Sequence, residues 1–234
     1  MEEFFKENYV VLTKLVVFTA FFSGLLTYKK FKGTVIRSFI WFLLAVVLIE
    51  FIASYPRMLL KWGRFDLIEG LLIERNYWWY TLSWTTGSAL YFSFFFRKVI
   101  TNKILKTILR IGFMSMIAAV VITLIVDYRD FFSGFPVLIE VVSFLVVIVS
   151  AISYFIEILL TDKILSFYKS VSFYISCAIL FWWLINTPLV FFEVYNSTAD
   201  WNFIFLKWQI RLFSNVVTYL TFTFALLWCK PQNV

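Results

Sequence analysis

The chain has 234 residues, 62% of them hydrophobic and 30 of them phenylalanine, and its net charge at pH 7 is +7. Soluble globular domains are about 45–50% apolar, so this composition excludes an ordinary water-soluble protein and predicts an integral membrane protein. The basic residues lie in short segments between apolar runs and belong to no nucleic-acid-binding motif, so we expect no nucleic-acid partner.

Seven apolar runs follow one another along the chain, and each has roughly the 20 residues that a membrane-spanning helix needs. We expect spans at 8–28, 36–55, 78–96, 106–126, 137–160, 171–192 and 206–229. Because the runs are continuously apolar rather than alternating, they are not the strands of a β-barrel. The sequence therefore predicts an all-α fold in which residues 1–234 form one polytopic domain, a bundle of seven transmembrane helices.

Charged residues of the loops predict the orientation of this bundle. Two loops are basic and hold no acid, and their residues are Lys29, Lys30, Lys32 and Arg37, then Arg97, Lys98, Lys103, Lys106 and Arg110. Acids gather in the other segments, at Glu2, Glu3, Glu7, Asp66, Glu69, Glu74, Asp127, Asp130, Glu193 and Asp200. Short loops rich in Lys and Arg face the cytoplasm, so we expect the N-terminus outside and the C-terminus in the cytoplasm.

The basic inner loops also predict partners. Each Lys or Arg near the membrane surface gains about 1 kcal/mol from anionic lipid, so we expect contact with anionic lipid of the bilayer. A cytoplasmic or membrane protein partner could dock on the same loops. Within 99–109, Ile100, Ile104 and Ile108 form one helical stripe, which predicts either an interfacial helix or a cytoplasmic extension of the fourth span.

Several residue types needed for chemistry are scarce. Histidine is absent, which removes the commonest metal ligand and general base. Since no nucleophile stands beside a base, we expect no enzyme, no catalytic residues, no metal site and no cofactor. Cys177 and Cys229 fall on the cytoplasmic side, where we expect no structural disulfide. The acidic start predicts that the first span is not a cleaved signal peptide.

Ionisable side chains inside the spans are the candidate binding residues, because such groups are costly in a bilayer and mark functional sites. They cluster in the expected outer half of the bundle: Lys14, Glu50, Glu140, Lys207 and Arg211, with Asn186 beneath them. Lys207 and Arg211 are four residues apart and share a helical face. We therefore expect an outward-facing polar pocket for a small molecule, ion or lipid, with a positive balance that favours an anion or a carboxylate.

Other observations bear on this pocket. Pro188 removes a backbone donor within the sixth span and frees a carbonyl, which in a membrane must find a partner or line a cavity. The alternative to a pocket is that Lys14 and Lys207 extend their ammonium groups to the membrane surface. Glu50 could also form a structural ion pair with Arg57 or Arg211.

Glu157 is a further acid, near the inner end of the fifth span. It is 17 residues from Glu140, which is about 25 Å along a helix, so the two carboxylates cannot act on one bond. We expect Glu157 to form a structural ion pair with Lys163, Lys169 or Arg97.

Tyr and Trp residues gather near the expected outer membrane surface, at Tyr77, Trp78, Trp79, Tyr80, Tyr195, Trp201 and Trp208. This distribution is typical of an aromatic belt. A cage for a cationic ligand around Trp78 and Trp79 is the alternative.

Five short strings, at 66–70, 76–79, 164–169, 197–201 and 206–210, resemble those of small bacterial seven-helix membrane proteins with no assigned activity. The similarity runs along the whole chain. The resemblance implies a bacterial inner membrane and assigns no functional residue.

Three known seven-helix activities are excluded by missing residues. A retinal protein needs a lysine in the middle of its last span, and 213–224 contains none. No span holds the two aspartates of an intramembrane aspartyl protease, and a zinc protease of the H-E-x-x-H type needs histidine.

Three functions remain, and an enzyme that acts on lipid ranks behind all of them. The first is a receptor-like or sensor subunit that signals through a partner protein. The second is a small secondary transporter or channel, which needs polar residues through the whole depth of the membrane. The third is a non-catalytic subunit of a membrane complex.

Overall fold

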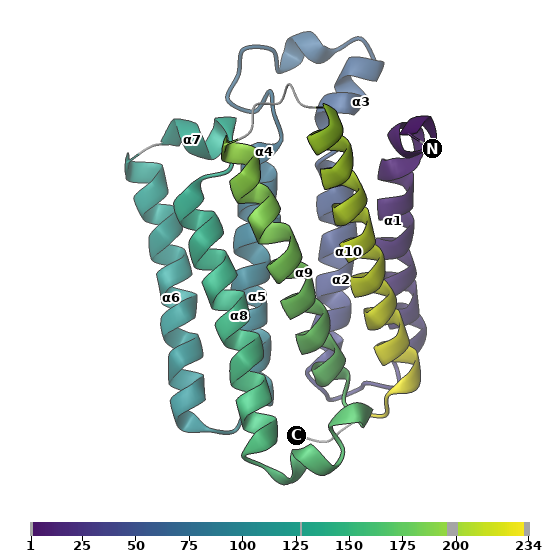
Figure 1. Cartoon of the computed structure of the whole chain (residues 1–234), viewed down its shortest axis with the longest axis vertical. Helices are drawn as coiled ribbons and strands as arrows, with labels where there is room; N and C mark the ends of the chain where they lie inside the picture. Colours follow the sequence, from purple (N-terminus) through teal and green to yellow (C-terminus); the bar gives the residue numbers. More distant parts are fainter. Residues whose placement is uncertain (1, 127, 196–200, 232–234) are drawn as a thin grey trace.

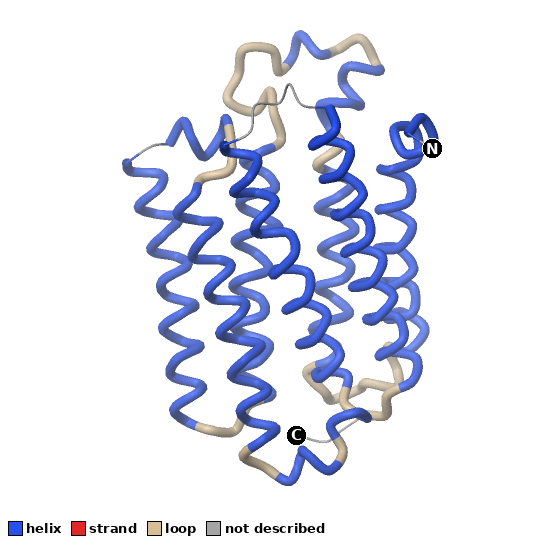
Figure 2. The backbone as a smooth tube through the Cα atoms, viewed as in Figure 1, coloured by secondary structure: helices blue, strands red, loops and turns tan. Residues whose placement is uncertain are grey.

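A computed structural model describes residues 2–126, 128–195 and 201–231. Within these ranges every regular element is helical and no strand occurs, as predicted (Figure 2). The principal helices are α1 (Glu2–Thr27), α2 (Ile36–Ile52), α5 (Gly87–Val99), α6 (Lys103–Val126), α8 (Val137–Leu159), α9 (Val171–Tyr195) and α10 (Trp201–Trp228). Shorter helical pieces are α3 (Tyr55–Lys61), η1 (Phe65–Leu67), α4 (Tyr77–Trp79), η2 (Tyr80–Thr86), α7 (Tyr128–Ser133), η3 (Asp162–Leu165) and η4 (Phe167–Lys169).

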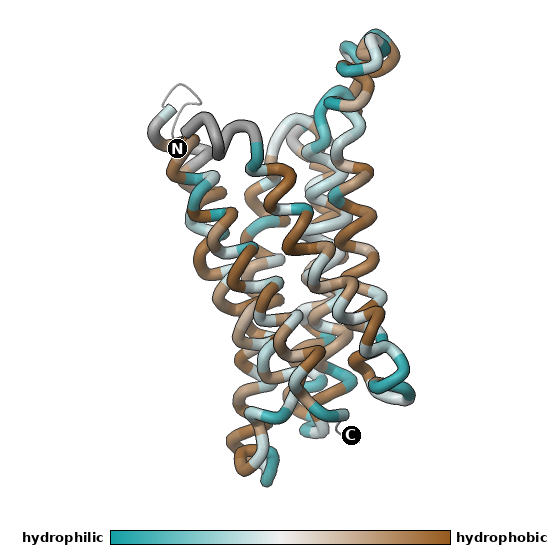
Figure 3. The backbone as a smooth tube through the Cα atoms, turned by 90° about the vertical axis from the view of Figure 1, so that its right-hand side faces the viewer, coloured by the Kyte–Doolittle hydropathy of each residue, from teal (hydrophilic) through white to brown (hydrophobic). Residues whose placement is uncertain are grey.

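Six helical segments in the described residues are long and apolar enough to cross a membrane. They are Asn8–Thr27, Ile36–Lys61, Lys103–Val126, Val137–Leu159, Val171–Val190 and Phe203–Trp228. Hydrophobic residues cover the length of the helices and hydrophilic residues concentrate toward the two ends (Figure 3). These features indicate a helical, multi-pass membrane bundle.

The predicted third span differs from the other six. Residues 77–99 are helical without a break, but they divide into α4, the π-helical stretch η2 and α5. The longest piece, α5, has 13 residues, fewer than the roughly 20 that a spanning helix needs. A π-helical stretch widens the helical turn and is frequently found at functional sites. Length and composition therefore do not identify 77–99 as a membrane span. A bundle of seven spans, rather than six, stays a prediction.

The helices form a closed arrangement in which the first and last lie together. Helix α1 packs against α2 and α10, α10 packs against α9, and α9 packs against α8, which also contacts α5 and α6. The end that carries α3 and α7 is called the upper end below, and the end that carries residues 160–170 is the lower end (Figure 1).

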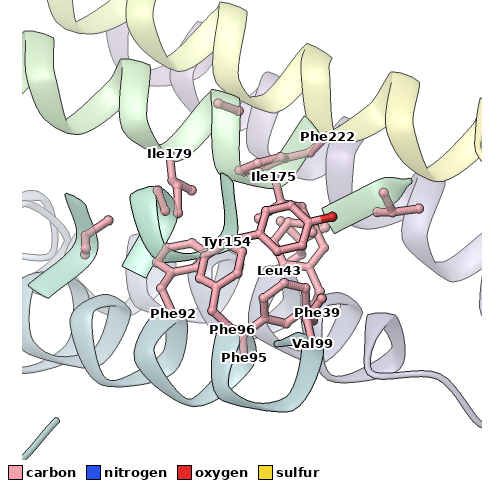
Figure 4. Packing of buried hydrophobic residues seen from close by; sticks show 14 of the residues in the cluster. Phe39, Leu43, Phe92, Phe95, Phe96, Val99, Tyr154, Ile175, Ile179 and Phe222 are labelled. Carbon is pink, nitrogen blue, oxygen red and sulfur yellow. The ribbon is translucent and has the colours of Figure 1, made fainter. Parts of the chain in front are cut away.

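The lower half of the bundle is filled by aromatic and branched side chains (Figure 4). Ten of the buried residues there are Phe39, Leu43, Phe92, Phe95, Phe96, Val99, Tyr154, Ile175, Ile179 and Phe222. Their rings meet edge to face, tilted or stacked, with 4.9 Å between the ring centres of Phe39 and Phe222, 5.4 Å between those of Phe96 and Tyr154 and 6.4 Å between those of Phe92 and Phe96. The high phenylalanine content of the chain thus supplies a dense plug between the helices. This set is called the aromatic plug below.

Candidate functional site

A cavity of about 380 Å³ lies in the upper half of the bundle. Its walls come from the middle of α1, the end of α2, the π-helical stretch η2, the start of α8, the second half of α9 and the part of α10 from 208 to 219. Small-molecule sites usually measure about 300–1,000 Å³, so the cavity is large enough to hold a small ligand. It is called the upper cavity below.

The structure brings five of the six predicted site residues together around this cavity: Lys14, Glu50, Glu140, Asn186 and Arg211. Lys207 is not among the lining residues, although it is only 9% exposed. Sharing a helical face with Arg211 was therefore not enough to place Lys207 in the wall. The step of four residues moves it about 6 Å along the axis of α10, toward the upper end of the bundle.

One wall joins α1, α2 and η2 through polar contacts. Lys14 Nζ donates a hydrogen bond of 2.8 Å to Ser54 Oγ, directly after α2. The Ser54 hydroxyl in turn donates to the carbonyl of Glu50 at 3.0 Å. The hydroxyl of Tyr80 donates to Oε2 of Glu50 at 3.2 Å. Lys14 of α1 therefore contacts the segment that joins α2 to α3, and both residues line the cavity.

Another part of the wall carries Glu140, in the first turn of α8. Its side chain is 6% exposed and accepts a hydrogen bond of 3.2 Å from the Thr85 hydroxyl of η2. The partial positive charge of a helix N-terminus favours an acid in this position. The guanidinium of Arg211 also lies near enough to interact electrostatically with the carboxylate of Glu140.

Neither cavity carboxylate forms an ion pair with a residue that the structure describes. Among the described residues, no Lys or Arg nitrogen lies within 4.0 Å of a carboxylate oxygen of Glu50 or Glu140. The alternative in which Glu50 forms an ion pair with Arg57 or Arg211 is therefore not seen among these residues. A carboxylate offers about four acceptor positions, and each of these two receives one side-chain hydrogen bond. Both carboxylates keep acceptor capacity for a further donor.

Asn186 links α9 to α10 at one side of the cavity. Its Nδ2 donates to Ser214 Oγ at 2.9 Å and to the carbonyl of Trp182 at 2.8 Å. The indole Nε1 of Trp182 donates to Asn215 Oδ1 at 2.7 Å. Helix α9 runs through Pro188 without ending. These bonds fix the two helices relative to each other where they border the cavity.

Aromatic residues make up much of the remaining wall, which the sequence did not predict. The lining includes Tyr9, Tyr77, Tyr80, Trp84, Trp182, Trp183, Trp208 and Tyr219. The rings of Tyr9 and Trp208 stack at 5.6 Å, and those of Trp84 and Trp182 meet edge to face at 5.2 Å. A helix that is apolar on all sides has no polar face to show which side turns toward the cavity. The one available signal was that some of these aromatic residues are close in the sequence to a charged residue inside a span.

Trp78 and Trp79, the alternative cage, do not line the cavity. Their indole nitrogens donate to the Tyr55 hydroxyl at 3.2 Å and to the carbonyl of Ile49 at 3.1 Å. These bonds attach the start of the 77–99 segment to the end of α2, which is a structural role.

At the lower end, Glu157 has the partner that the sequence predicted. Lys163 Nζ lies 3.7 Å from its Oε1. The same carboxylate accepts hydrogen bonds from the backbone amides of Thr101 at 2.7 Å and Asn102 at 3.3 Å. Glu157 therefore joins the end of α8 to the turn that precedes α6, more than 20 Å along α8 from the upper cavity.

Comparison of the chain with models of protein families, with curated proteins and with solved structures gives no match.

Proposed function

We propose that the protein is a receptor-like or sensor subunit of the plasma membrane. In this proposal it binds a small molecule in the upper cavity and signals through a partner protein docked at the basic lower loops. The single observation that carries the proposal is the cavity itself: charged residues from α1, α2, α8 and α10 converge on it, and two of its carboxylates have no ion pair. Buried charges without a structural pair are costly, which favours a role in binding.

The aromatic plug favours binding over conduction. A transporter or channel needs a polar route that continues below the cavity, and this half of the bundle is packed with Phe, Leu and Ile (Figure 4). Two of the hydroxyls there bond to their own helix: Ser150 donates to the carbonyl of Val146 and Ser176 donates to that of Ser172. Because these hydroxyl protons are already donated to the backbone, they are not available as hydrogen-bond donors to a solute that crosses the membrane.

We further propose that the chain crosses the membrane seven times. The N-terminus and the upper cavity then lie on the outer side of the membrane, and the C-terminus lies in the cytoplasm. The helical continuity of 77–99 supports the seventh crossing, and the basic residues of the lower loops support the orientation. The experiment places single cysteines at exposed positions 69 and 103, on either side of this segment, after Cys177 and Cys229 are replaced by alanine. A membrane-impermeant maleimide should label Glu69→Cys in intact cells and Lys103→Cys only in opened cells. Equal labelling of both would overturn the seventh crossing.

The ligand test is native mass spectrometry of protein extracted gently from its own membrane. We expect a reproducible bound small mass that is lost in Arg211→Ala. The matched control is Arg64→Ala, because Arg64 is exposed and does not line the cavity. Circular dichroism and thermal unfolding check that both variants fold. A stoichiometric protein partner without any bound small molecule would overturn the proposal and favour a non-catalytic subunit of a complex.

A further inference from the structure

One part of the wall of the upper cavity is a continuous strip of polar and aromatic side chains. Glu140 of α8 accepts the hydrogen bond of 3.2 Å from Thr85 in η2. The residue before Thr85 is Trp84, whose ring meets that of Trp182 in α9 edge to face at 5.2 Å. Trp182 Nε1 donates to Asn215 Oδ1 in α10 at 2.7 Å. Because all five residues line the cavity, these contacts place a carboxylate, two indole rings and a side-chain amide along one surface.

Asn186 extends this surface, since it also lines the cavity and its Nδ2 donates to the carbonyl of Trp182 at 2.8 Å. The six residues together are called the cavity strip below. Asn186 Nδ2 also donates to Ser214 Oγ, whereas its Oδ1 accepts no hydrogen bond within the described part of the chain. Asn215 is the reverse, because its Oδ1 accepts from Trp182 and its Nδ2 donates to no described residue. With a single side-chain hydrogen bond to Glu140, the cavity strip keeps unused acceptors at Glu140 and Asn186 and unused donors at Asn215.

We propose that the ligand of the upper cavity is a neutral sugar, a mono- or disaccharide, that lies along the cavity strip. Its hydroxyl groups bind Glu140, Asn186 and Asn215, and a face of C–H groups packs against the indole rings. The proposal rests on the function proposed above and names the chemical class of the ligand.

Hydroxyl groups suit a surface that offers both unused acceptors and unused donors. Each hydroxyl carries one donor and two acceptor positions, so a sugar can donate to the Glu140 carboxylate and to Asn186 Oδ1 while it accepts from Asn215 Nδ2. An ammonium group has no acceptor and a carboxylate has no donor, so either would leave part of the cavity strip without a partner. Polar groups that are removed from water without a partner are unfavourable.

The charges near the cavity strip do not require a charged ligand. The guanidinium of Arg211 interacts electrostatically with the carboxylate of Glu140, and the ammonium of Lys14 does so with that of Glu50. A neutral ligand leaves these interactions in place. Hydrogen bonds from hydroxyls to an ionised carboxylate are stronger than those between neutral groups, so Glu140 can hold a sugar without any charge on the ligand.

The indole rings favour a sugar over a smaller polar solute. The C–H groups on one face of a sugar ring carry partial positive charge, and the face of an aromatic ring is negative. The rings of Trp84 and Trp182 stand at 75° to each other, so they offer surfaces in two directions beside the polar groups. The volume of about 380 Å³ lies in the usual range of small-molecule sites and leaves room for one or two sugar rings.

The test begins with the molecule that native mass spectrometry releases from the wild-type protein. Extraction uses a polyoxyethylene detergent, because the sugar heads of glucoside and maltoside detergents would compete for the cavity. The released molecule is treated with periodate, which cleaves between carbons that carry adjacent hydroxyls, and separately with amine-reactive and carboxyl-reactive reagents. Cleavage by periodate without reaction at an amine or a carboxyl supports the neutral sugar.

The other results separate this inference from the function on which it rests. A released molecule that resists periodate, or that carries an amine or a carboxyl, overturns the sugar but leaves the receptor proposal intact. The absence of any bound molecule defeats the receptor proposal itself.

Two variants test the placement of the sugar on the cavity strip. Glu140→Gln removes the charge of the acceptor and Trp84→Leu removes one indole ring, and we expect each to weaken binding of the released sugar by at least about 10-fold. The matched controls are Glu69→Gln and Trp62→Leu, because both residues are exposed and do not line the cavity. Circular dichroism checks that all four variants fold. Affinity for the sugar that is unchanged in both Glu140→Gln and Trp84→Leu would overturn the placement.

Discussion

The ammonium of Lys163 lies 3.7 Å from the carboxylate of Glu157, a side chain that is 1% exposed. Lys163 Nζ also donates to the carbonyl of Val99 at 3.3 Å, at the end of α5. Glu157 accepts hydrogen bonds from the amides of Thr101 and Asn102, which lie between α5 and α6. One ion pair therefore ties three segments together at the lower end: the end of α5, the start of α6 and the loop after α8.

Removing the charge of Glu157 should destabilise the fold. Hydrogen bonds to a charged group contribute about 1.5–3 kcal/mol each, and Glu157→Gln weakens those from Thr101 and Asn102 together. We expect a loss of about 2 kcal/mol, measured as earlier thermal unfolding in detergent. Asp162→Asn is the control, because Asp162 is exposed in the following turn. Unfolding of Glu157→Gln at the same temperature as this control would contradict the prediction.

The bond between Asn186 and Ser214 should show direct coupling between α9 and α10. Hydrogen bonds between membrane helices contribute about 0.6 kcal/mol on average and up to about 1.7 kcal/mol. In a double-mutant cycle of Asn186→Ala and Ser214→Ala, we expect a coupling energy in this range, read from unfolding in detergent. Purely additive effects would show that the 2.9 Å contact contributes no net stability.

The unpaired carboxylate of Glu50 should cost the protein stability. Glu50 is half-buried, and a charge that is partly removed from water without an ion pair is unfavourable, so Glu50→Gln should unfold at the same or a higher temperature than the wild type. Tyr80→Phe removes the side-chain donor to that carboxylate and should destabilise by about 1–3 kcal/mol. In the Glu50→Gln background, the Tyr80→Phe effect should shrink. If Glu50→Gln destabilises as much as Tyr80→Phe, the carboxylate is a structural group.

Much of the architecture was predictable because membrane helices need long apolar runs. The stripe at 100–108 illustrates this in part: helix α6 begins at Lys103 and continues to Val126, so Ile104 and Ile108 lie on an extension of the fourth span. Ile100 has an extended backbone before that helix, so its place in a helical stripe was wrong. The convergence of Glu50, Glu140 and Arg211 was also predictable, since charged residues at similar depth in a bundle are driven away from lipid toward a shared interior.

Other features depend on tertiary contacts that the sequence does not reveal. The residue types of the π-helical stretch η2 do not distinguish it from an α-helical span. Its buried threonines, Thr81, Thr85 and Thr86, are also common in α-helical spans. Trp208 fits an aromatic belt by position, yet it lines the cavity because it stacks on Tyr9 of α1. Whether Trp208 faces the cavity depends on the rotation of α10 about its own axis, and the packing of α10 against α1 sets that rotation.

Two helix glycines should respond in opposite ways to alanine. Alanine stabilises a helix by about 1 kcal/mol relative to glycine. A Cβ at Gly112 would lie 3.5 Å from Val146 Cγ2, an ordinary contact, so Gly112→Ala should stabilise. A Cβ at Gly24 would lie 3.1 Å from Ile40 Cγ2 and 3.2 Å from its Cγ1. Since a β-branched side chain on a helix has one favoured χ1 rotamer, α1 and α2 must separate.

Overpacking of this kind costs about 1–3 kcal/mol, which exceeds the gain in helix propensity, so Gly24→Ala should lower the unfolding temperature. Ile40→Ala removes both close atoms. In that background, Gly24→Ala should raise the unfolding temperature relative to Ile40→Ala alone, as measured by thermal unfolding of all four proteins in one detergent. If Gly24→Ala stabilises the wild-type chain as Gly112→Ala does, Ile40 moves aside and the approach of α1 to α2 does not require glycine.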